Sequence, residues 1–167
     1  MHDDGAMTDR TAGADDAPRR PVRSRDALGR PLPPGQPGVA QLPDDLRLTP
    51  QETLTKAQEL LDDGLAFYAH EVFEARWKNC PDQERELWQG LAQLAVGITH
   101  IQRGNPTGAA SLLRRSAARL RATGDAPYGI DAAGLAVYAE ALAAGLSQDP
   151  TPTADRLRPR LRSGEHR

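Results

Sequence analysis

Proline is distributed unevenly along this chain of 167 residues, and the distribution limits where helices can form. Eight of the 14 prolines lie within residues 1–50. The run 31–37 contains four of them, and each removes a backbone hydrogen-bond donor, so no helix can persist there. Helices are therefore expected C-terminal to this segment.

Composition divides the chain into three parts. Residues 1–48 are predicted to form a disordered tail and then an extended arm, because apolar residues there are scattered. The apolar residues of this arm are Leu28, Leu32, Val39, Leu42, Leu46 and Leu48. Residues 49–146 are predicted to be the folded domain, since five of the seven aromatic residues lie within 67–88. Residues 147–167, where arginine alternates with leucine and proline, are predicted to be a disordered basic tail.

The same composition excludes several classes of protein. No apolar stretch of about 18 residues is present, which excludes a transmembrane helix. Cys80 is the only cysteine, which excludes a disulfide scaffold. The chain opens with no export signal, and its formal net charge of −2 gives no general attraction to nucleic acid or membranes. We therefore expect a soluble cytoplasmic protein with no membrane partner.

Helix start and stop signals follow one another through residues 49–146. A capping box at 49–52 opens a first helix, which Gly64 ends. Four further helices are predicted over 65–79 and 83–103, from Asn105-Pro106, and from Asp131. The short connections predict an all-α fold, a small up-and-down antiparallel bundle of about five helices with irregular N- and C-terminal tails.

The predicted helix over 83–103 is apolar nearly all round and should lie at the centre of the bundle. Gly90, Gly97 and Gly104 recur on it every seven residues. Since glycine destabilises a helix, three aligned glycines predict the close approach of another helix. That helix can belong to this chain or to a second copy, so the glycine repeat is compatible with a homodimer.

The predicted helix over 65–79 carries the sharpest candidate site. His70 and Glu74 are four residues apart, so their side chains meet on a face that also bears aromatic residues. If the glycine-bearing face of the next helix opposes it, an interior polar cluster results. Its members are His70, Glu71, Glu74, Trp77, Gln89, Gln93 and His100. Buried ionisable groups must be paired, so the cluster serves either chemistry or the helix register.

Two other functions compete with a structural role for this region. A metal-assisted hydrolase would bind a divalent metal ion through His70, Glu74 and His100, with Glu71 as the base. The chain lacks the Glu-x-x-His motifs of di-iron bundles, however. A phosphate or nucleic-acid binder would use the basic residues of the fourth helix, which are Arg114, Arg115, Arg119 and Arg121. A solvated helix face carries the same pattern, so nucleic acid is the less favoured partner.

The cluster residues also carry a family resemblance. His-Glu-Val-Phe-Glu-Ala-Arg-Trp over 70–77 precedes Gln-Gly-Leu-Ala-Gln-Leu-Ala over 89–95, and His100, Gly104-Asn105 and Gly108 follow. Residues 52–122 thus resemble the bacterial and archaeal family called domain of unknown function 309. Residues 30–33 and 38–39 resemble an N-terminal arm of actinobacterial members. The resemblance implies a small helical bundle without an established activity. We therefore expect a protein of unknown function that acts as an interaction module.

Overall fold

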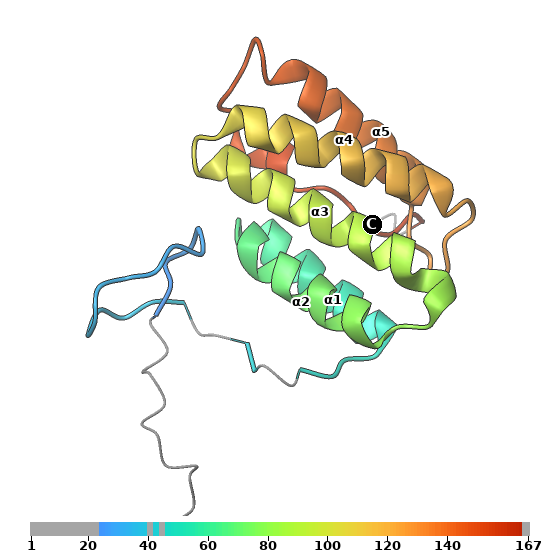
Figure 1. The fold of residues 1–167 in the computed structure, drawn as a ribbon, viewed down its shortest axis with the longest axis horizontal. Coiled ribbons are helices and arrows are strands. Elements are labelled where there is room, and N and C mark those ends of the chain that lie inside the picture. Colours follow the sequence, from blue (N-terminus) through green and yellow to red (C-terminus); the bar gives the residue numbers. More distant parts are fainter. Residues whose placement is uncertain (1–23, 40–41, 44–45, 165–167) are drawn as a thin grey trace, which may run out of the picture.

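Five helices form a row in which each packs against the next (Figure 1). The computed structural model describes residues 24–39, 42–43 and 46–164. Its helices are α1 (Pro50–Asp62), α2 (Ala66–Asn79), α3 (Arg85–Gln102), α4 (Pro106–Ala122) and α5 (Ala132–Gly145), with short 3-10 helices η1 (Asp82–Glu84) and η2 (Ala154–Leu157). The predicted all-α bundle is confirmed. Over the described ranges, no helix is both long and apolar enough to cross a membrane.

The helix ends follow the predicted capping signals. The Thr49 hydroxyl accepts a hydrogen bond from the Glu52 amide, and the Glu52 carboxylate accepts one from the Thr49 amide. Asn105 and Asp131 cap α4 and α5 by accepting from backbone amides of the first turn. Helix α3 begins at Arg85 rather than at 83, because the preceding residues form η1.

Helix α3 lies at the centre of the row, as its apolar sequence predicts. Gly90 and Gly97 face α4: the Ser116 hydroxyl donates to the Gly90 carbonyl oxygen at 2.7 Å, and a Cβ at Gly97 would lie 2.8 Å from Leu113. Gly104 instead ends α3 with a φ of +77°, and a Cβ there would meet no described atom within 4 Å. Two glycines therefore serve packing within the chain, and the third allows the helix to end.

Helix α2 buries only part of the predicted face. Its buried side chains are Ala66, Tyr68, Ala69, Val72 and Phe73. Phe73 of the predicted face is thus in the core, but the side chains of His70 and Glu74 are 23% and 39% exposed. Because α2 packs between α1 and α3, its buried stripe turns toward both neighbours. The predicted His70–Glu74 pair therefore lies at the margin of the bundle and not in its interior.

The C-terminal segment is ordered over 147–164, in contrast to the predicted disordered basic tail. It returns past the helices to α1 (Figure 1). The Gln58 amide donates to the Pro159 carbonyl oxygen and accepts from the Leu161 amide, both at 2.9 Å. Leu157 and Leu161 are 8% and 1% exposed. Burial of these leucines outweighs the ordering entropy, and we call residues 147–164 the strap. Residues 165–167 lie outside the described residues.

Residues 24–39, which we call the arm, form a loop at the other end of the chain. The Leu32 amide donates to the Ser24 carbonyl oxygen at 2.7 Å, and the Asp26 carboxylate accepts from two amides of the loop. The arm therefore keeps a defined shape without a helix. Four of the apolar residues of the predicted arm pack against the core. Val39 lies within residues 24–39, and Leu42, Leu46 and Leu48 follow it. The predicted disordered tail over 1–23 lies outside the described residues.

Candidate functional site

The exposed edge of α2 carries a chain of ion pairs built from predicted residues. His70 Nε2 lies 3.0 Å from Glu74 Oε2, and Lys78 Nζ lies 3.4 Å from Glu74 Oε1. Burial lowers the pKa of His70, and the charge of Glu74 offsets part of that effect. Nδ1 of His70 is buried without a hydrogen-bond partner among the described residues.

The predicted members on α3 do not join His70. Gln93 Oε1 accepts a hydrogen bond from Arg119 Nε of α4 at 3.1 Å. His100 Nδ1 lies 3.1 Å from Asn105 Nδ2, at the end of its own helix. The expected single interior cluster is therefore not formed. The prediction required the glycine-bearing face of α3 to oppose α2, but Gly90 and Gly97 on that face pack against α4.

The remaining members lie at separate points of the α2 and α3 surfaces. Trp77 is half-buried, and the guanidinium of Arg85 lies 5.3 Å from its ring centroid. Gln89, also half-buried, follows one turn after Arg85. Glu71 lies near Tyr68, because its charge is second only to burial in raising the pKa of that hydroxyl.

The predicted metal ligands do not assemble. Within the ranges that the structure describes, no group of three or more histidine, cysteine, aspartate or glutamate side chains could hold a metal ion. His70 pairs with Glu74 within α2, whereas His100 contacts Asn105. A metal-assisted hydrolase therefore lacks its expected ligand set here. A divalent metal cofactor stays a prediction from the sequence.

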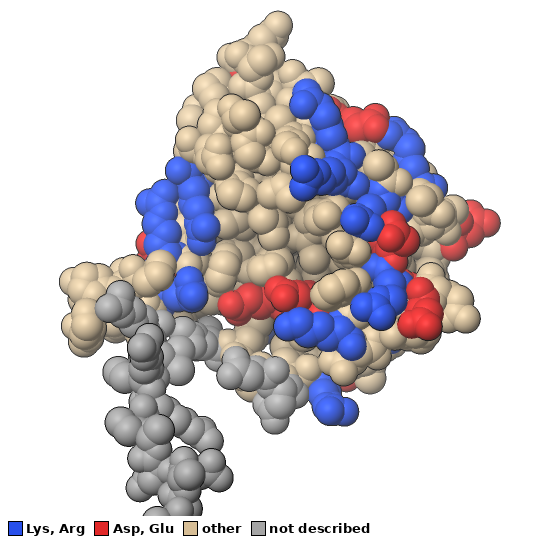
Figure 2. All heavy atoms as spheres, in the orientation of Figure 1, with Lys and Arg blue, Asp and Glu red and all other residues tan. Residues whose placement is uncertain are grey.

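The arginines of α4 are partly engaged by carboxylates. Arg119 Nη1 lies 2.8 Å from Glu86, and Arg121 pairs with Glu140 of α5. Arg114 and Arg115 are exposed. Figure 2 shows acidic side chains interspersed with basic ones on the face that α2, α3 and α4 form. Two of the four cations are thus compensated, which weakens the attraction that a phosphate backbone would experience.

A second surface of α2, which the sequence did not predict as a site, holds the arm. The Tyr68 hydroxyl donates to the Asp26 carbonyl oxygen at 2.7 Å. Arg103 Nε donates to the Leu28 carbonyl oxygen at 2.9 Å. Both side chains therefore bind main-chain oxygens of the arm. We call Phe67, Tyr68 and Arg103 the docking corner.

Phe67 is the aromatic centre of the docking corner. Two guanidinium groups lie over its ring, those of Arg25 from the arm and of Arg103, each 5.5 Å from the ring centroid. Such contacts stabilise by about 0.5–1 kcal/mol each at exposed sites. Gly29 lies against the same ring, where any Cβ would overlap it, and its φ of +77° disfavours other residues. Docking of the arm therefore depends on glycine at this position.

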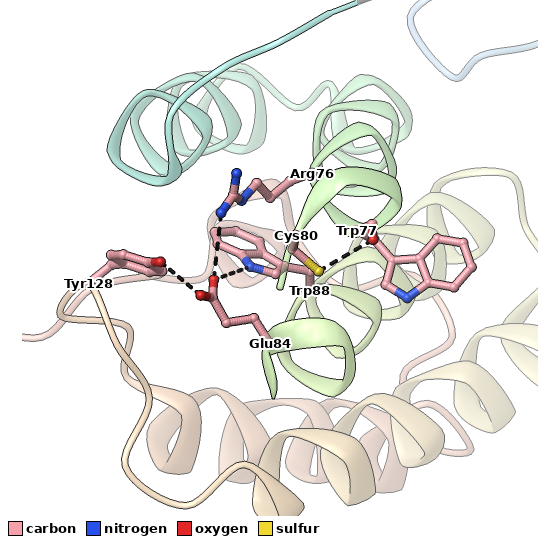
Figure 3. A network of polar contacts seen from close by, with 6 residues as sticks. All are labelled: Arg76, Trp77, Cys80, Glu84, Trp88 and Tyr128. Carbon is pink, nitrogen blue, oxygen red and sulfur yellow. Dashed lines mark hydrogen bonds and ion pairs between the residues drawn. The ribbon is translucent and has the colours of Figure 1, made fainter. Parts of the chain in front are cut away.

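At the other end of α2, a half-buried network joins α2, η1, α3 and the segment before α5 (Figure 3). Glu84 accepts from Trp88 Nε1 at 3.0 Å and from the Tyr128 hydroxyl at 2.9 Å. The guanidinium of Arg76 lies 5.7 Å from the Trp88 ring centroid. Burial raises the pKa of the nearby Cys80 thiol, which is the opposite of an activated nucleophile. These contacts fix the helices relative to one another.

The fold and its surfaces define a class of protein, a single-row bundle of antiparallel helices with a docked arm and a docked strap. Residues 54–112 match the family described as Domain of unknown function (DUF309). The match confirms the resemblance predicted from the sequence, and it covers about a third of the chain. The matched stretch contains all three residues of the docking corner, whereas the arm and the strap lie outside it.

A relative of known sequence supports the same assignment. The chain is 40% identical over 57 residues to "Uncharacterized protein YpuF" of Bacillus subtilis (strain 168). The matched stretch covers 34% of this chain and 33% of that relative, so the chain spans about a third of the relative's length. No solved structure matches the chain. The comparisons thus show a similarity to this family over α1, α2, α3 and the start of α4.

Proposed function

We propose that this protein is an interaction module whose docking corner binds extended polypeptide segments. The observation that carries this proposal is the pair of hydrogen bonds from Tyr68 and Arg103 to carbonyl oxygens of the arm, at 2.7 and 2.9 Å. Bonds to main-chain atoms give affinity for any segment of suitable shape. The arm is the segment that occupies the corner in this structure.

The contacts of the arm suit reversible binding. Leu28 and Leu32 are only half-buried, so docking removes little apolar surface from water. The other contacts include the packing of Val39 against the core, a few hydrogen bonds, at about 0.5–1.5 kcal/mol each, and the two guanidinium contacts of Phe67. A segment held in this way leaves and returns without unfolding the helices.

The partner that we propose is a polypeptide in the cytoplasm. It can be a different protein or a second copy of this chain, whose arm would then fill the corner of its neighbour. The two alternative functions have less support, because the metal ligands are dispersed and two of the α4 arginines are paired with carboxylates.

A peptide-binding experiment on the full chain tests this function. The substitution Gly29→Leu should release the arm, because the new side chain overlaps Phe67. Gly35→Leu is the matched control, since Gly35 also has a positive φ but an added Cβ there meets no described atom within 4 Å. The probe is a fluorescent peptide of residues 24–39, and its affinity for each chain is measured by anisotropy.

We expect the peptide to bind the Gly29→Leu chain at least about ten-fold more tightly than the wild type, in which the tethered arm competes at high effective concentration. The Gly35→Leu chain should behave as the wild type does. Adding Phe67→Ala to the Gly29→Leu chain should abolish binding. Equal affinity for all the chains, or none for Gly29→Leu, would rule the proposal out.

A further inference from the structure

A pocket of about 230 Å³ lies between α1 and α2, beneath residues 46–48. Its walls are both apolar and polar, and they include Leu46, Leu48, Val72, Ala75, Arg76 and Asn79. None of these residues belongs to the docking corner. The pocket is therefore a separate candidate site at the other end of α2.

Two charged residues line this pocket, Arg47 and Arg76. Arg47 is exposed, whereas the Arg76 side chain is 15% exposed and its ion pair with Glu84 is long, with Nη2 3.8 Å from Oε1. Glu84 already accepts hydrogen bonds from Trp88 and Tyr128. Nε of Arg76 is buried and has no hydrogen-bond partner in the part of the chain that the structure describes.

The orientation of Arg76 leaves room for an additional acceptor. Figure 3 shows one terminal nitrogen directed at Glu84, while the other points away from Glu84 toward α1. The pocket lies on that side of Arg76, since α1 forms its opposite wall. Buried polar groups normally find a partner, and a guanidinium has five N–H donors. An anion in the pocket would accept a hydrogen bond from the terminal nitrogen that points toward α1.

We propose that this pocket binds a small aliphatic carboxylate. The planar guanidinium matches the two oxygens of a carboxylate, and Leu46, Leu48 and Val72 provide apolar surface for its hydrocarbon chain. Asn79 Nδ2 donates to the Ala75 carbonyl oxygen, which holds that side chain at the pocket wall. At roughly 30 Å³ for each heavy atom, 230 Å³ holds a ligand of about the size of hexanoate.

Calorimetric titration of the full chain with sodium hexanoate tests this proposal, with 1-hexanol as the uncharged comparison. Ala75→Leu fills the pocket without removing the charge of Arg76. Ala118→Leu, on the exposed face of α4, is the matched control. Arg76→Gln removes the charge and keeps a side chain of similar length.

We expect hexanoate to bind one site per chain and hexanol to bind at least about ten-fold more weakly, because a charge-assisted hydrogen bond is lost. Arg76→Gln should weaken hexanoate binding by about the same factor and leave hexanol unchanged. Ala75→Leu should abolish binding, and Ala118→Leu should preserve it. The Gly29→Leu chain should bind hexanoate as the wild type does. The hexanoate result therefore does not depend on whether the docking corner binds peptides.

Two outcomes would overturn the proposal. One is equal affinity for hexanoate and hexanol, which would show that no cation takes part. The other is hexanoate binding that persists in a folded Ala75→Leu chain. If circular dichroism shows that Arg76→Gln does not fold, the alcohol comparison and Ala75→Leu decide the question alone.

Discussion

The arm and the strap are both non-helical segments that side chains of the bundle hold in place, but they bury very different surfaces. Leu157 and Leu161 of the strap are 8% and 1% exposed, whereas Leu28 and Leu32 of the arm are half-buried. Full burial of a leucine contributes about 1.5–3 kcal/mol. The strap is therefore part of the fold, and the arm is an addition to it.

Hydrogen bonds add to this difference, because the strap also pairs with the segment before α5: the Asp131 amide donates to the Leu161 carbonyl oxygen, and the Ser163 amide donates to the Gly129 carbonyl oxygen. Gln58 bonds to two main-chain groups of the strap, and Tyr68 and Arg103 bond to two main-chain groups of the arm. The net contribution of each such bond is about 0.5–1.5 kcal/mol. Apolar burial and main-chain pairing thus both hold the strap more firmly than the arm.

The largest expected change is in the free energy of unfolding when a leucine of the strap, rather than one of the arm, is replaced. Leu161→Ala should lower the free energy of unfolding by about 2–5 kcal/mol, because it leaves a cavity under the strap. The corresponding change in the arm, Leu32→Ala, should cost less than about 1 kcal/mol. Urea unfolding followed by circular dichroism measures both. Similar losses for the two variants would remove the distinction between the segments.

The next effect concerns the polar clamp on the strap. Gln58→Ala leaves the Pro159 carbonyl oxygen and the Leu161 amide without their partner, and it should cost about 1–3 kcal/mol in the same unfolding assay. The control is Gln51→Ala, an exposed position on the same helix, which should stay close to the wild type. A loss no larger than that of the control would mean that water replaces Gln58 fully.

A smaller effect on global stability is expected at the docking corner. Phe67→Ala removes the ring that Arg25 and Arg103 contact, so the arm should undock. The free energy of unfolding should change by less than about 1 kcal/mol, since the helices keep their core. Limited proteolysis with trypsin should cut after Arg25 faster in the variant. Unchanged cleavage together with a large loss of stability would make Phe67 a core residue instead.

The smallest effect is a dependence on pH. Because burial lowers the pKa of His70 below its ordinary value of 6.5, the unfolded chain binds a proton more readily than the folded one. The stabilisation is complete above pH 6.5 and declines as the pH falls toward the lower folded pKa. His70→Gln should flatten this slope in unfolding experiments between about pH 5 and 7. If the free energy of unfolding keeps the same slope against pH in this variant, groups other than His70 cause the pH dependence.

Much of the fold follows from local sequence signals. The capping box at Thr49 and the side-chain caps at Asn105 and Asp131 act over a few residues, so their positions predict the helix starts. The ordered strap was missed because its arginines suggest a solvated tail. Its Leu-x-Pro-x-Leu alternation over 157–161 is typical of an extended segment with one buried face, and that signal indicates the docking that the structure shows.

The candidate sites were less predictable because they depend on which helix each face meets. The His70–Glu74 pair follows from its spacing within one helix, and the structure contains it. The contact of Gln93 with Arg119 depends on the close packing of α3 and α4, which no local pattern specifies. The docking corner has a weak signal only, in the glycine at 29 and the aromatic pair at 67 and 68.

Hydrogen exchange of the wild-type chain, followed by mass spectrometry, tests most directly whether the arm is exchangeable and the strap is not. The measurement compares the chain alone with the chain in excess free peptide of residues 24–39. We predict that the peptide accelerates exchange of the chain's own arm amides and leaves those of residues 157–163 unchanged. Arm amides that exchange as slowly as the strap amides, and that ignore the peptide, would contradict the account.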